Sequence, residues 1–282
     1  ASRVLGEYQL ETRTVDDELT ALAERMVEVR NPFLRTGGAA LLGPALVVSE
    51  VDVGEDVIAS LSEHITMSEL LVESFERKLD NLQPVFLVFT EVDDAHSEAV
   101  ADSIETAAIE TYLHTHHENA RGVTARLLRS VAATEPETVA QYTLDLILRL
   151  RDDASQAALH AGRALAELAD EQGVAPLRPT TQILPQALET TDPDALTGVV
   201  ELLVTVVEAD PEWTTDLPVE RVSDLQTSDA VADRPRLRSK LAATLGRYAK
   251  SRDRSVIGEG FPEFVLGTVT VDPAEDASLP NP

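Results

Sequence analysis

The residues best suited to chemistry stand in one short stretch, His114-Thr115-His116-His117-Glu118. Imidazole and carboxylate groups are ordinary ligands of zinc and iron, so this stretch could bind a metal ion. Consecutive side chains at a turn between helices point in different directions, so a complete site would need a ligand from another element, such as His96 or His160. We interpret the stretch as a solvated turn. A metal-binding module or metal-dependent enzyme centred on it is the alternative.

A second candidate is the basic region near the C-terminal end of the chain. It consists of Arg234, Arg236, Arg238, Arg247, Arg252 and Arg254. Guanidinium groups bind phosphates and carboxylates well, but the aromatic residues that would stack on nucleic-acid bases are few. Arginines in the last turn of a helix also stabilise the negative end of its dipole. Binding of a polyanion or nucleic acid here is therefore the alternative to a structural role.

The only tryptophan, Trp213, follows Asp210-Pro211-Glu212 in a predicted loop. An aromatic residue in such a loop usually fills the gap between neighbouring helix pairs, and an exposed anchor for a partner is the alternative. The sequence contains no Gly-rich phosphate loop, serine nucleophile elbow or paired-carboxylate motif. We therefore predict no catalytic residue, no cofactor and no metal site.

The elements that must position these residues are helix pairs that recur along residues 135–250. In each pair, a first apolar helix leads through a turn that carries Asp to a second helix rich in small residues. The turns contain Asp152-Asp153, Asp192-Pro193-Asp194, and Asp229 with Asp233. A period of about 40 residues, built of helix, turn and helix, is the signature of a helical solenoid.

With these residues in view, residues 97–250 resemble the HEAT-repeat family and its HEAT-like archaeal and bacterial relatives. In that family the second helix opens with Val-Arg and continues with small residues. Leu237-Arg238, followed by Ala242-Ala243-Thr244-Leu245-Gly246, matches this pattern. Thr197 and Ala158 stand near the Arg position of two other repeats, so the ladder of Asp and Arg expected of the family is incomplete. The resemblance implies an all-α, right-handed α-solenoid of about six helix pairs.

The resemblance also bears on the two candidate sites. HEAT-like hydroxylases that use a di-iron centre carry several His-Glu pairs on successive repeats, whereas this chain has one, His117-Glu118. HEAT-like DNA glycosylases use a basic concave surface, but here the only basic region is at one end of an acidic chain. Neither enzymatic relative is therefore the leading expectation.

Residues that interrupt helices divide the rest of the chain into segments. Residues 1–14 form an expected extended N-terminal lead-in, residues 15–252 the repeat array, and residues 253–282 a closing helix or strand with a disordered acidic tail. Hydrophobic periodicity predicts further helices over residues 16–29, 33–48, 57–65, 68–79, 97–113 and 119–131. Residues 83–92 suit a buried strand as well as a helix, and their place among helices favours a helix.

The charge is strongly negative, with 50 acidic and 23 basic residues and a net charge of −27. The acids are spread along the chain and lysine is scarce, which is typical of proteins kept soluble in a salt-adapted cytoplasm, such as that of a haloarchaeon. An acidic face that recruits a basic partner is the second interpretation. Direct nucleic-acid binding is not expected, because phosphate contacts need a basic face.

Together these patterns predict a non-catalytic scaffold or adaptor that binds another protein through one face of a helical array. The first twenty residues carry acids without an apolar core, so no secretory signal is expected. The longest apolar run is too short to span a membrane. We therefore expect a cytoplasmic protein whose partner is a protein of unknown identity and not a membrane.

Overall fold

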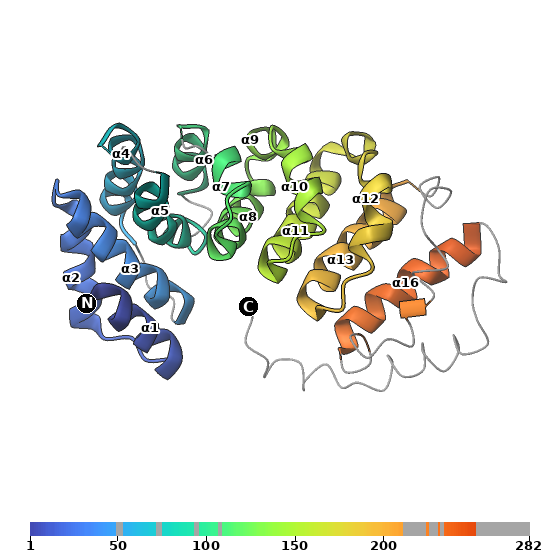
Figure 1. The fold of residues 1–282 in the computed structure, drawn as a ribbon, viewed down its shortest axis with the longest axis horizontal. Coiled ribbons are helices and arrows are strands. Elements are labelled where there is room, and N and C mark those ends of the chain that lie inside the picture. Colours follow the sequence, from blue (N-terminus) through green and yellow to red (C-terminus); the bar gives the residue numbers. More distant parts are fainter. Residues whose placement is uncertain are drawn as a thin grey trace. The chain divides into compact units, whose positions relative to one another are not determined.

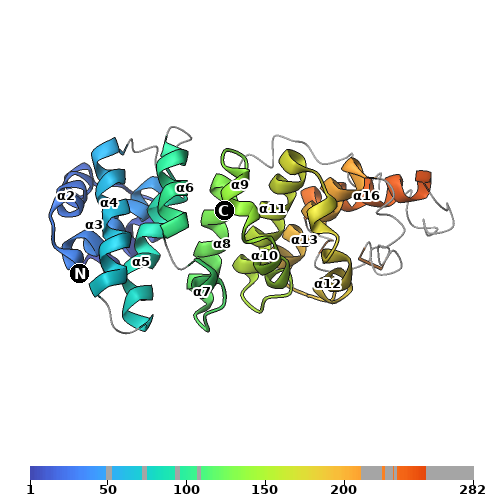
Figure 2. The same ribbon diagram turned by 90° about the horizontal axis from the view of Figure 1, so that it is seen from above.

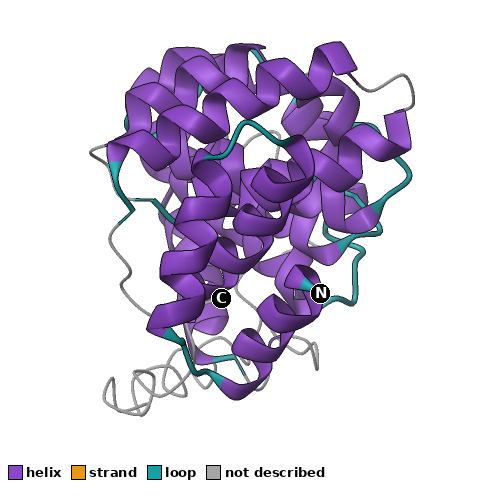
Figure 3. Cartoon of the chain, turned by 90° about the vertical axis from the view of Figure 1, so that its left-hand side faces the viewer, coloured by secondary structure: helices purple, strands orange, loops and turns teal. Residues whose placement is uncertain are grey.

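The computed structural model describes residues 1–48, 53–71, 75–92, 96–106, 109–210, 224–225, 231 and 234–251. Every regular element in these ranges is a helix, and none is a strand (Figure 3). The chain divides into two compact units, Ala1–Asp145 and Leu146–Pro282. The predicted all-α fold is confirmed. Trp213 and the segment 253–282 lie outside the described residues.

The first unit contains nine helices in the part described and the start of a tenth. They are α1 (Ser2–Thr12), α2 (Asp17–Glu28), α3 (Pro32–Val48), α4 (Glu55–Leu71), α5 (Phe75–Phe89), α6 (Ser97–Thr106), α7 (Ile109–Leu113), α8 (Glu118–Ala132), α9 (Pro136–Ala140) and α10 (Thr143–Arg149). Helices α1 and α2 both pack on α3 (Figure 1). In the core the rings of Phe86 and Tyr112 meet edge to face, with centroids 5.3 Å apart. Such a contact fixes α5 against α7 more specifically than aliphatic packing does.

The second unit holds the repeats that are clearest in the sequence. Its further elements are α11 (Ser155–Gln172), a short 3-10 helix (Ala175–Leu177), α12 (Thr180–Ala187), α13 (Pro193–Ala209) and α16 (Pro235–Ser251). Helix α13 packs on α11 on one side and on α16 on the other (Figures 1 and 2). The three long helices are therefore successive second helices of the predicted pairs.

The ends of these helices follow the capping signals in the sequence. The side chains of Asp16 and Asp192 each accept hydrogen bonds from two backbone amides of the helix that follows. Helix α13 also has Pro193 at its first position, where a missing amide hydrogen costs nothing. Gly173 ends α11 with a φ of 80°, a conformation that favours glycine. The helix start predicted at residue 16 is confirmed.

Two predicted boundaries are wrong. Residues 1–14 are not an extended lead-in, because Ser2–Thr12 form α1 and bury Gly6 and Gln9. The predicted end of a helix at residue 65 is wrong, since α4 continues to Leu71. The helix predicted over 97–113 is helical over Ser97–Thr106 and Ile109–Leu113, and the two residues between these elements lie outside the described ones. Local signals are weak at such places, and packing on a neighbouring helix decides where a helix ends.

Residues 83–92, which the sequence leaves open to strand or helix, continue α5 to Phe89. The helix contains Pro84, which cannot donate the usual backbone hydrogen bond. Packing of α5 on α3, α4 and α8 stabilises the helix despite this loss. The helical interpretation of this stretch is confirmed, although the helix begins earlier than predicted.

Glycine allows the closest helix contact in the second unit. A Cβ atom added to Gly162 would lie 2.3 Å from the carbonyl oxygen of Gly198, and one added to Gly198 would lie 2.5 Å from the carbonyl oxygen of Leu159. These obstacles are backbone atoms, so side-chain rotation cannot remove them. Helices α11 and α13 therefore touch backbone to backbone, and a larger residue at either glycine would force them apart.

Replacement of Gly198 by a larger residue should destabilise the protein. We expect Gly198→Ala to lower the free energy of unfolding by about 1–3 kcal/mol, because the new methyl group overpacks the helix contact. Gly246→Ala in α16 is the matched control, since no described atom lies within 4 Å of its added Cβ. That change should raise stability by about 0.5–1 kcal/mol through helix propensity. Denaturant unfolding at one fixed salt concentration measures both. Equal effects would contradict the close contact.

Candidate functional site

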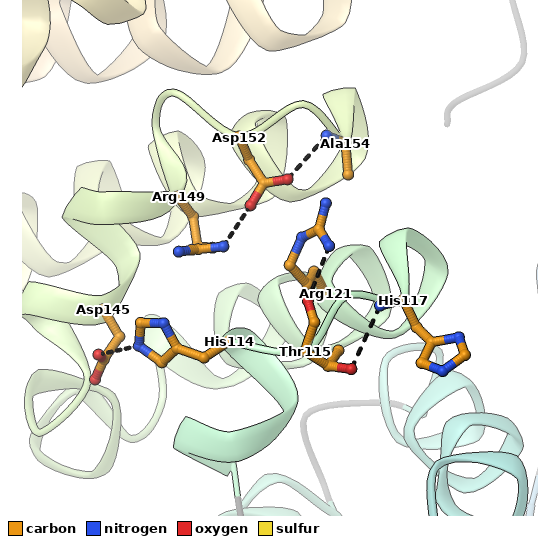
Figure 4. A network of polar contacts seen from close by, with 8 residues as sticks. All are labelled: His114, Thr115, His117, Arg121, Asp145, Arg149, Asp152 and Ala154. Atoms are coloured by element: carbon orange, nitrogen blue, oxygen red, sulfur yellow. Dashed lines mark hydrogen bonds and ion pairs between the residues drawn. The ribbon is translucent and has the colours of Figure 1, made fainter. Parts of the chain in front are cut away.

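The histidine-rich stretch forms the turn between α7 and α8, as predicted. The Nε2 atom of His114 lies 2.8 Å from Oδ1 of Asp145 at the start of α10. His117 is the residue before α8, its side chain makes no capping bond, and its backbone amide donates to Oγ1 of Thr115. Figure 4 shows the rings of His114 and His117 directed to opposite sides of the turn. These imidazoles do not converge on one point.

No other element supplies the missing ligands in the part of the chain that the structure describes. There, no group of three or more His, Asp or Glu side chains is placed to hold a metal ion. The imidazole of His96 lies 3.2 Å from the backbone oxygen of Val53, and His160 is buried within α11. The turn is thus held by His114 with Asp145 and by Thr115, which is a structural role.

Two buried arginines hold the turns that lead into second helices. The Nε atom of Arg35 donates to the backbone oxygen of Val29 at 3.1 Å, and Nη1 of Arg121 donates to that of Thr115 at 2.9 Å. In both cases the acceptor lies six residues earlier, in the turn itself. A charge-assisted bond to a backbone carbonyl is stronger than a neutral one, so each arginine ties its helix to the turn before it. Figure 4 shows the second of these bonds.

Sequence reasoning missed these two arginines because it searched for the Arg position only from residue 97 onward and in the clearest repeats. Arg35, Arg121 and Arg238 are each the fourth residue of their helix, in α3, α8 and α16. Ala158 and Leu196 hold that position in α11 and α13. A count from the first helical residue would have revealed the register, but those first residues were not fixed by sequence alone.

A polar cluster surrounds the first of these arginines. Arg35 also donates to the carboxylate of Glu63 at 2.7 Å, and Thr36 Oγ1 lies 3.1 Å from Nε2 of His64. Burial, the larger influence, and the positive charge of Arg35 together lower the pKa of His64 to about 4. The hydrogen bond from Arg35 also holds the pKa of Glu63 below its ordinary value. His64 is therefore a neutral group inside the first unit.

This histidine should make stability depend on pH. Between pH 6.5 and about 4 the unfolded chain binds a proton at His64 and the folded chain does not, so stability is full above this window and is lost as pH falls through it. The loss approaches about 3 kcal/mol. In the His64→Gln variant this loss of stability should disappear. The measured quantity is the difference in the free energy of unfolding between pH 7 and pH 4.5. Exposed His116→Gln is the control. Parallel curves for the wild type and His64→Gln would refute the assignment.

Two arginines of the basic region near the C-terminal end are paired with acids of α13. Arg234 lies 2.7 Å from Asp194, and Arg247 pairs with Glu208. Between them, Lys240 lies 2.5 Å from Glu201. The partner acids thus offset the charge of these three residues. The structure does not describe the side chain of Arg236, and Arg252 and Arg254 lie outside the described residues.

The same acids also join α13 to α11. The carboxylate of Glu201 accepts a hydrogen bond from Nε of Arg163 at 2.8 Å and forms an ion pair with Lys240. These two partners are 38 and 39 residues away from Glu201 in the sequence. Burial, the largest influence, raises the pKa of Glu201. The hydrogen bonds from Arg163 and Lys240 outweigh burial and keep this pKa below its ordinary value. Three successive helices, α11, α13 and α16, are therefore linked by one chain of ion pairs through Glu201.

Comparisons with known proteins bear on the fold. No protein-family model matches the chain, and no curated protein matches it. The chain is similar to the crystal structures of three engineered proteins from the Northeast Structural Genomics Consortium. The first is 16% identical with a TM-score of 0.65, and it covers 90% of this chain, which spans 65% of that protein's length. The other two are 14% and 15% identical with TM-scores of 0.61 and 0.63, cover 84% and 81% of this chain, and are each spanned to 98%.

The fold defines the structural class of the protein. The chain is an all-helical protein with a helical repeat-like fold. Among the described residues, no helix is both long and apolar enough to cross a bilayer.

Proposed function

We propose that this protein is a non-catalytic scaffold or adaptor that binds another protein through one surface of a HEAT-like, right-handed array of helix pairs. Helical repeats suit this role because each pair contacts only its neighbours and leaves a continuous surface for a partner. The ion pairs that join α11, α13 and α16 in the second unit support an array in which each second helix contacts the next.

The observation that carries the proposal is the number of large apolar side chains left exposed on helices. Phe33 is 80% exposed, Val4 66%, Leu144 63% and Tyr8 59%. Val4 and Tyr8 lie on α1 and Phe33 lies on α3, and these two helices pack on each other. Exposed apolar side chains that gather on packed helices commonly mark a site of protein contact. The pairing of Arg234, Lys240 and Arg247 with carboxylates argues against a polyanion as the main ligand.

A stoichiometric complex with a protein tests the proposal. The intact chain is used to capture proteins from a high-salt extract, and each captured protein is purified and titrated against it by calorimetry. We expect at least one to bind saturably at a fixed ratio. A variant with Leu144→Asp and Leu148→Asp measures how much of this binding depends on the exposed apolar surface of α10. If no purified protein binds while stoichiometric metal is found in the chain and lost in His116→Ala with His117→Ala, the metal-dependent alternative replaces the scaffold.

We also propose that the acidity is an adaptation to a salt-rich cytoplasm. A net charge of −27 opposes compact structure through self-repulsion, and concentrated salt screens that repulsion. The free energy of unfolding should therefore fall as molar KCl is removed, which circular dichroism and denaturant titration at several salt concentrations measure. Full stability in dilute buffer would favour a dedicated acidic interface instead.

A further inference from the structure

We draw no further inference here: the strongest candidate, the acidic side chains of Asp170 and Glu208 in the last turns of α11 and α13, seven residues after the ion-paired Arg163 and Glu201, carries nothing because Glu208 is already paired with Arg247 and no second feature of the described residues points to a ligand there.

Discussion

The second unit depends on the backbone contact between α11 and α13. Gly162 and Gly198 let the two helices approach until one helix touches the backbone of the other. At that distance Arg163 can reach Glu201, so the ion pairs along the helices depend on the same close approach. Small residues are therefore more than fillers here, because they set the spacing on which packing and electrostatics both rely.

Acidic residues of the second unit take part in ion pairs that join its helices. Glu201 and Glu208 each meet a basic side chain of α16, and Asp194 meets Arg234 just before that helix. These basic residues join helices within an acidic protein. Arg234 and Arg247, which the sequence places in a basic region, become contacts between helices in the structure, because their partner acids lie about 40 residues earlier.

The turns divide into two kinds with different chemistry. The turns before α3 and α8 are held by a buried arginine, Arg35 or Arg121, that binds a backbone oxygen six residues earlier. The turn before α11 is held by Asp152, which accepts from the amide of Ala154 and pairs with Arg149 (Figure 4). The histidines before α8 add a bond to Asp145 but no metal geometry among described residues. These turns position helices, which fits a protein that works through its surface.

The sequence by itself determined the helical class, the repeat spacing and several helix ends, because periodicity and caps such as Asp16 and Asp192 act locally. The helical state of Ser2–Thr12, the pairing of Arg234 with Asp194, and the burial of His64 were decided only by tertiary structure. Each depends on a neighbour far away in sequence, and local propensity holds no information about such a neighbour.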